Sequence, residues 1–169
     1  MHQNFLSKTE RDALAPRVRA ACEGQGRPDG EARWLVKVNA RSLVAVKRGH
    51  QTAGLVLSVR EVFFVGDRLT LVDGAPGEKR SGPWVLRDTV VTSVEVACLM
   101  EDTVCTSAPC GSLLAIMGSR TIWFHGERAD HWARQLGFKS YADCKACVAL
   151  QTALPCDAFI VRWDAEEET

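Results

Sequence analysis

The chain has no excess of charge of either sign, because 21 lysine and arginine residues balance 21 aspartate and glutamate residues. Any nucleic-acid role must therefore rest on a local basic patch rather than on overall charge. No segment approaches the roughly 18 consecutive apolar residues of a membrane-spanning helix. The N-terminus lacks the basic segment and long apolar core of a secretory signal. These absences predict a soluble, cytoplasmic protein with no membrane partner.

The seven cysteines are an odd number, and a reducing compartment favours free thiols over a disulfide framework. Cys144 and Cys147 have the spacing of a zinc-ligand or redox pair. They fall within a segment that reads as a capped helix, on one face with Val148, so we favour core packing over zinc binding and redox chemistry. The glycine-rich residues 74–82 do not lead from a strand into a helix, as a phosphate loop would. We therefore expect no metal and no cofactor.

Local patterns divide the chain into three parts. Ser7 and Glu10 form a capping box at the start of a predicted helix over residues 7–22, and the glycine-rich and proline-containing residues 23–30 end it. Acidic residues dominate the C-terminal end, which is typical of a solvated tail. The predicted organisation is a helical appendage with its linker at 1–30, a main domain at 31–164 and an acidic tail at 165–169.

The main domain reads as a run of strands followed by two helices and a last strand. The Gly66-Asp67 turn opens a strand at 67–72, which we expect to be the central strand of a small barrel. In the long strand 84–98, the apolar positions that include Val90 and Val94 share one face, and residues 101–112 read as a loop. The other predicted strands are 34–38, 55–59, 113–117, 121–124 and 159–163, and the predicted helices are 42–47, 127–136 and 141–153. Sequential strands with segregated helices indicate an α+β domain.

This order of features resembles the ASCH domain over residues 33–164. The landmarks are Arg41 after an early strand, Gly49 after a short helix, the Gly66-Asp67-Arg68-Leu69 turn, the strand with Val91-Thr92-Ser93-Val94, and the late Leu136-Gly137-Phe138 and Ser140-Tyr141-Ala142-Asp143 segments. The resemblance is to phage- and prophage-type small proteins. It implies a PUA-like curved β-barrel with flanking helices, here with an extra N-terminal helix. That fold is similar to RNA-binding and modified-base-binding domains.

One departure from the family pattern concerns catalysis. ASCH proteins usually carry G-x-K-x-x-T-[IL]-R after the short helix, where the lysine and threonine serve amidohydrolase chemistry and the arginine helps shape the groove. Aligned on Gly49, those positions hold Gln51, Gly54 and Val56, and Thr52 replaces the threonine only with a shift. Glutamine cannot act as a nucleophile or base as a buried lysine can. Glu95 can occupy the acid position, but it lacks that basic partner, so we assign no catalytic residue.

A basic segment, residues 41–60, flanks the mouth of the groove that the resemblance implies. Its cations can neutralise phosphates, or they can simply form a solvated surface. Trp84 can stack on a base, or it can pack in the barrel. The predicted ligand-binding residues are Arg41, Lys47, Arg48, His50, Gln51, Thr52, Arg60, Trp84 and Glu95. Arg68 and Arg87 are predicted to pair with nearby acids. His125 and His131 fit no catalytic triad pattern and read as surface or satisfied histidines.

The leading hypothesis is a small binding module for RNA, single-stranded nucleic acid or a modified nucleotide, with a degenerate catalytic motif. One alternative is a phage-type protein-interaction factor that blocks a host defence complex. The other is an ASCH-type amidohydrolase or ribonuclease. These three remain open at the level of the sequence.

Overall fold

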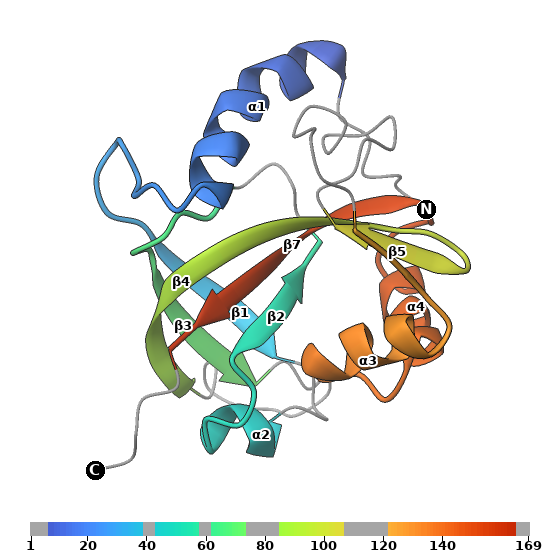
Figure 1. Ribbon diagram of the computed structural model, residues 1–169. Helices are drawn as coiled ribbons and strands as arrows, with labels where there is room; N and C mark the ends of the chain where they lie inside the picture. The colour runs from blue at the N-terminus through green and yellow to red at the C-terminus, as the bar shows by residue number, and fades with distance from the viewer. Residues whose placement is uncertain (1–6, 39–42, 58–61, 74–84, 107–121, 165–169) are drawn as a thin grey trace.

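The computed structural model describes residues 7–38, 43–57, 62–73, 85–106 and 122–164 (Figure 1). Four helices and a seven-stranded sheet make up this α+β fold. The helices are α1 (Lys8–Cys22), α2 (Leu43–Lys47), α3 (Glu127–Gln135) and α4 (Tyr141–Ala149). The strands are β1 (Arg33–Val38), β2 (Ala53–Val56), β3 (Arg68–Asp73), β4 (Val85–Leu99), β5 (Thr103–Thr106), β6 (Ile122–His125) and β7 (Cys156–Trp163).

The long strand β4 is the hub of the sheet. It pairs antiparallel with β3, β5 and β7, and it arches across the whole molecule in Figure 1. The paired order is β1-β3-β4-β5-β6, with β7 branching from β4 and β2 pairing with β7. Strand β3, predicted to be central, instead lies between β1 and β4, and it pairs parallel with β1. The prediction was wrong in this respect because β4, at 15 residues, is long enough to hold three partners.

The sheet curls strongly but does not close into the predicted barrel. Five strands follow one another in the order β1-β3-β4-β7-β2, and among the described residues no backbone ladder joins the two ends. Closure requires every edge strand to find a partner. Here β1 and β2 remain edges, and we call the opening between them the seam.

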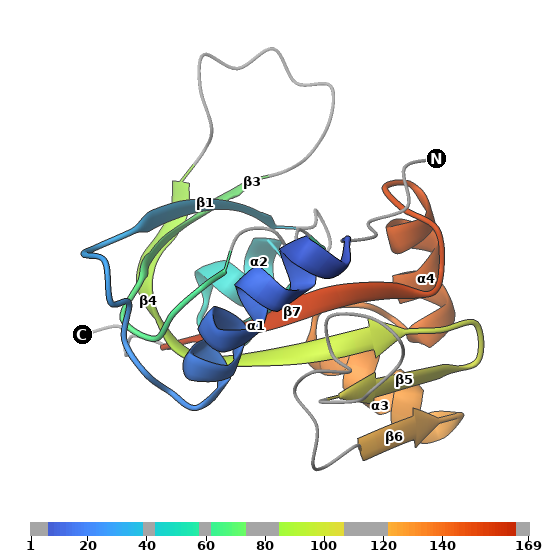
Figure 2. The same cartoon turned by 90° about the horizontal axis from the view of Figure 1, so that it is seen from above.

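Helices cover the curled sheet on two sides. Figure 2 shows α1 in front of β4, where Val18 and Ala21 are buried in the core inside the curl. The predicted capping box at Ser7 and Glu10 is present, so the start of α1 is confirmed. Helices α3 and α4 pack together and form a second core with β5 and β7. Ser140 caps α4 through the Asp143 amide, as its sequence predicts.

The inward face of β4 changes along its length. Val91 and Val94 are 1% and 2% exposed whereas Val90 is 40% exposed, which contradicts the prediction that Val90 and Val94 share one face. The register of β4 against β7 shifts between Val91 and Ser93. An extra residue at such a bulge exchanges the two faces of a strand. Alternation from one end of the strand therefore gave the wrong face for Val90.

The segment predicted to be a loop at 101–112 contains strand β5. It pairs antiparallel with β4 on one side and with β6 on the other. Strand β6 coincides with most of the predicted strand 121–124. The predicted strand 113–117 and its hairpin turn lie outside the described residues.

A candidate binding pocket at the seam

The Gly66-Asp67 turn is held by a buried carboxylate. Gly66 adopts a φ of 91°, a left-handed conformation that favours glycine. The Asp67 carboxylate, which is buried, accepts hydrogen bonds from Arg27 Nε at 3.0 Å and Nη2 at 2.8 Å, from Trp34 Nε1 at 2.8 Å and from the Phe64 amide at 3.0 Å. One side chain thus joins the linker after α1, strand β1 and the turn before β3.

The surroundings of Asp67 set its protonation. Burial alone would raise the pKa of this carboxyl group. The hydrogen bonds from Arg27, Trp34 and Phe64, together with attraction to the Arg27 guanidinium, outweigh burial and hold the pKa below its usual value. The pair of Arg27 and Asp67 is therefore charged at neutral pH, and it fixes the indole of Trp34 in one orientation.

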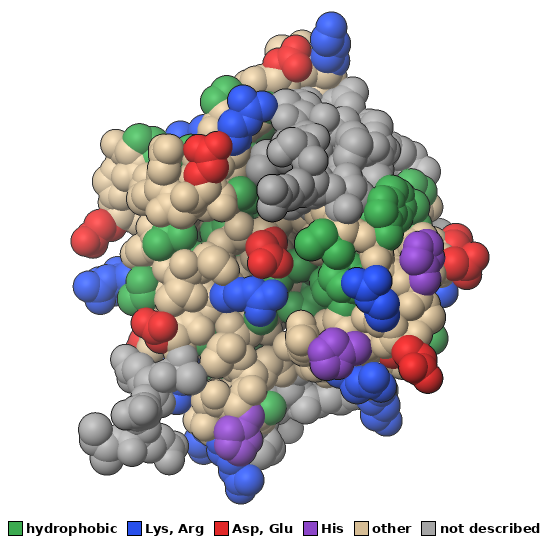
Figure 3. All heavy atoms as spheres, in the orientation of Figure 1, with side chains coloured by type: hydrophobic (Ala, Val, Ile, Leu, Met, Phe, Trp, Pro, Cys, Tyr) green, Lys and Arg blue, Asp and Glu red, His purple; other side chains and the backbone are tan. Residues whose placement is uncertain are grey.

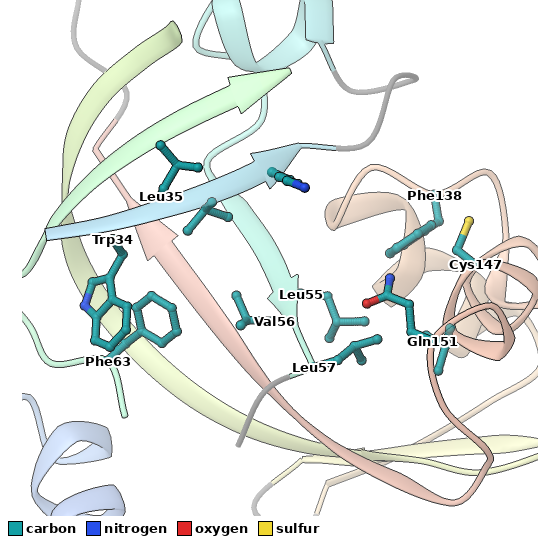
Figure 4. Close-up of a pocket in the computed structure, with 12 residues that line it drawn as sticks. Trp34, Leu35, Leu55, Val56, Leu57, Phe63, Phe138, Cys147 and Gln151 are labelled. Atoms are coloured by element: carbon teal, nitrogen blue, oxygen red, sulfur yellow. The ribbon is translucent and has the colours of Figure 1, made fainter. Parts of the chain in front are cut away.

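A pocket of about 520 Å³ opens at the seam, with Trp34 in its wall (Figure 4). One wall comes from β1, and another comes from β2 and the residue after it. Phe63 contributes from the segment before β3. The rest comes from the turn between α3 and α4, from the last part of α4 and from the residues just after α4. The lining residues are Trp34, Leu35, Val36, Lys37, Leu55, Val56, Leu57, Phe63, Phe138, Cys147, Val148 and Gln151. A volume in this range is typical of small-molecule sites, which run from about 300 to 1,000 Å³.

Strand edges, rather than strand faces, form two of these walls. Consecutive residues 34–37 of β1 line the pocket, and so do consecutive residues 55–57 at β2. Successive side chains of a strand point to opposite faces, so a wall that includes both faces must be the edge. The edges of β1 and β2 are unpaired on this side among the described residues. The edge of a strand that no other strand pairs with can offer backbone N–H and C=O groups to a ligand.

Aromatic side chains stand at both ends of the pocket. Figure 4 shows Trp34 and Phe63 together at one end and Phe138 at the other, next to Gln151. The Trp34 and Phe63 ring centroids are 4.6 Å apart, with the rings tilted by 39°. Lys37 and Gln151 supply polar side chains. The pocket thus combines flat apolar surfaces with a small number of hydrogen-bonding groups, as ligand sites commonly do.

None of the predicted ligand-binding residues that the structure describes is among those that line this pocket. Arg41, Arg60 and Trp84 lie outside the described residues. Gln51 is buried, and its Nε2 donates to the carbonyls of Ala53 at 3.0 Å and Leu136 at 3.2 Å. Its amide group therefore ties the start of β2 to the end of α3.

The remaining predicted residues lie nearer the surface. Lys47, Arg48 and His50 are exposed on α2 and the turn after it, Thr52 is half-buried, and the carbonyl of Thr52 accepts from the Trp163 amide at 2.9 Å. Glu95 is half-exposed and lies 3.6 Å from Arg162. Figure 3 shows basic and histidine side chains on the face that holds α2 and α3, interspersed with acidic and hydrophobic ones. The exposed basic and histidine residues on α3 are Arg128, His131 and Arg134.

Two cysteines of the predicted pair have different environments. Cys144 is buried in the second core, which confirms core packing for this residue. Burial, with the nearby Cys147, Cys156 and Asp143 as smaller causes, raises the pKa of the Cys144 thiol to about 12. Cys147 lines the pocket. In the described part of the chain, no group of three or more histidine, cysteine or acidic residues is arranged to hold a metal ion.

Arg87 does not fit the predicted pairing with an acid. Its Nη1 atom is buried, and among the residues that the structure describes it has no hydrogen-bond partner. The neighbouring Asp88 is exposed and instead accepts from the Thr70 hydroxyl at 2.8 Å. A second buried donor without a partner in the described region is Trp163 Nε1.

No protein-family model, curated protein or solved structure matches this chain significantly. Within the described ranges, no helix is long and apolar enough to cross a membrane. The case for function therefore rests on the geometry of the seam and its surroundings.

Proposed function

We propose that this protein is a binding module that takes a nucleobase, free or as part of a nucleotide or nucleic-acid strand, into the pocket at the seam. The observation that carries the proposal is the pocket of about 520 Å³ between two strand edges, with aromatic residues at both of its ends. Bases are recognised by stacking on aromatic rings and by hydrogen bonds to their edges. The edges of β1 and β2 at the seam, which no strand pairs with among the described residues, can offer those hydrogen bonds from the backbone.

The PUA-like and ASCH assignments belong to the same proposal. The strongly curled sheet, with α2 between β1 and β2 and helices at the end of the chain, supports a PUA-like architecture. In this proposal the pocket at the seam is the ligand groove. The exposed cations Lys47, at the end of α2, and Arg48, in the turn after it, serve the phosphates of a longer RNA or single-stranded ligand.

The proposal excludes the hydrolytic reaction that the family resemblance also implies. Gln51 uses its amide to bond two backbone carbonyls, so this side chain is structural. Glu95 is paired with Arg162 and lies outside the residues lining the pocket. Neither residue then supplies a nucleophile or a base to a bound ligand.

A binding titration with a matched pair of variants tests the proposal. Leu35 lines the pocket and is 58% exposed, whereas Val85 on β4 is 56% exposed and is not among the lining residues. We expect Leu35→Glu to weaken nucleoside or nucleotide binding by about tenfold or more, since a carboxylate would add a charge to an apolar wall. Val85→Glu should leave affinity unchanged. Equal effects of the two variants, or no binding of any base by the wild-type protein, would sink the proposal.

A second candidate function is a protein-interaction factor. Ile122 and Trp123 of β6 are exposed, and large exposed apolar residues on an edge strand favour contact with a partner chain. Immobilised wild-type protein and a Trp123→Ser variant, incubated with host lysate, discriminate the two functions. A stoichiometric protein captured only by the wild type, without nucleic acid, would support this candidate instead.

A further inference from the structure

The half-buried side chain of Arg87, whose Nη1 atom has no hydrogen-bond partner among the described residues, belongs to the inner face of the curled sheet. In the sheet register Arg87 lies opposite Leu71 of β3, and Leu71 lies opposite Val36 of β1. Residues directly opposite each other in neighbouring strands share a face. Leu71 is fully buried in the core inside the curl, so this row of three residues faces inward.

Among the described acids, the sequence neighbour of Arg87 is turned away, and Asp67 before β3 and Glu95 in β4 are already paired. Asp88, the next residue, points to the opposite face and bonds Thr70. Asp67 is occupied by Arg27, and Glu95 lies beside Arg162. Among the described residues, none accepts a hydrogen bond from Arg87 Nη1.

Arg87 is half-buried, and its buried Nη1 atom without an acceptor carries a desolvation cost that no hydrogen bond in the described residues offsets. Arginine is the residue best suited to bind a phosphate through two parallel hydrogen bonds. The row that contains Arg87 ends at Val36, which lines the pocket, and Figure 4 shows β1 along the pocket with β3 beside it. A ligand whose base lies at the seam would have to extend an anionic group along this row, past Leu71, to meet Arg87.

We propose that Arg87 binds the phosphate group of a nucleotide whose base occupies the pocket at the seam. This inference rests on the proposed function and adds the ligand class, a nucleotide rather than a neutral nucleoside.

Calorimetric titration of the full chain tests the assignment with the four ribonucleosides, their 5′-monophosphates and inorganic phosphate. We expect at least one monophosphate to bind about tenfold or more tightly than its nucleoside, as a charge-assisted hydrogen bond allows. Arg87→Gln should remove that preference and leave nucleoside affinity unchanged. Arg68→Gln, which changes an exposed arginine of β3, is the matched control and should keep the preference.

Thermal unfolding without ligand separates a binding role from a structural one. Since Arg87 Nη1 has no acceptor among the described residues, it should not stabilise the fold. Arg87→Gln and Arg87→Met should therefore unfold at the wild-type temperature or above it. Added phosphate should raise the melting temperature of the wild type only. Two results together would overturn the inference. One is a clearly lower melting temperature for Arg87→Gln and Arg87→Met. The other is a preference for the monophosphate that is retained in Arg87→Gln and in Arg87→Lys. Nucleoside binding that does not depend on Arg87, with no gain from phosphate, would overturn it and leave the proposed function standing. Arg87-dependent binding of inorganic phosphate without binding of any base would support the anion site and reject the base pocket.

Discussion

Replacing Asp67 with alanine should lower the free energy of unfolding by about 3–5 kcal/mol, the usual cost of removing one partner of a buried ion pair. The side chains of Arg27 and Asp67 are 12% and 2% exposed, so little water reaches the guanidinium that the variant leaves behind. Trp34 Nε1 and the Phe64 amide lose their acceptor as well. Urea denaturation followed by circular dichroism measures the change.

Asp29 provides a matched control for Asp67. It also lies near Arg27, at 3.8 Å, but its side chain is 58% exposed. Asp29→Ala should therefore cost no more than about 1 kcal/mol, as exposed ion pairs do. Comparable losses in the two variants would refute the argument that burial makes Asp67 the main support of this turn.

The acid limb of the stability curve gives an independent check. Because the pKa of Asp67 is lower in the folded chain than in the unfolded chain, the unfolded chain binds the proton more readily. The stabilisation is then fully present above the unfolded pKa, about 4 for an aspartate, and is lost as the pH falls toward the lower folded pKa. Asp67→Asn should flatten this part of the curve, and an unchanged slope between about pH 5 and pH 2 would contradict the assignment.

Three further predictions concern groups outside the Asp67 network. Gln51→Met keeps the size of the side chain but leaves the Leu136 carbonyl without its amide donor, so urea denaturation should show a loss of about 1–3 kcal/mol. Tyr141→Phe should cost a similar amount, because the hydroxyl accepts from the Met100 amide and shares its one proton between the carbonyls of Met100 and Thr103. A melting temperature equal to that of the wild type would count against this prediction. Cys144, whose pKa burial raises to about 12, should react with iodoacetamide at pH 8 only after denaturation, as peptide mass spectrometry can determine.

Much of the element order was predictable from local signals. Capping residues marked α1 and α4, and alternation marked β1, β3, the body of β4 and β7. Strand β5 was not predicted because four residues carry little periodic signal. Its stability comes instead from pairing with β4 on one side and β6 on the other. The bulge after Val91, which exchanges the inner and outer faces of β4, could not be predicted either, because a bulge depends on pairing with the partner strand.

The candidate site was far less accessible to sequence reasoning. Asp67 meets Arg27 from 40 residues away and Trp34 from 33 residues away, and no local pattern links them. The seam exists because two strands fail to pair, which is a property of the assembled sheet. The inward position of Arg87 could not be predicted from the sequence. It follows from the sheet register, which places Arg87 on the inner face and the adjacent Asp88 on the outer face.

Chemical-shift mapping of the backbone amides during a titration with the ribonucleoside 5′-monophosphates tests the central claim most directly. Binding at the seam should shift the amides of residues 35–37 and 55–57, because the edges of β1 and β2 form the walls of the pocket. The Nε–H signal of Arg87 should shift with a monophosphate and not with its nucleoside. Saturable shifts confined to β6 and α3, or no shifts with any of the monophosphates, would contradict a base-binding pocket between β1 and β2.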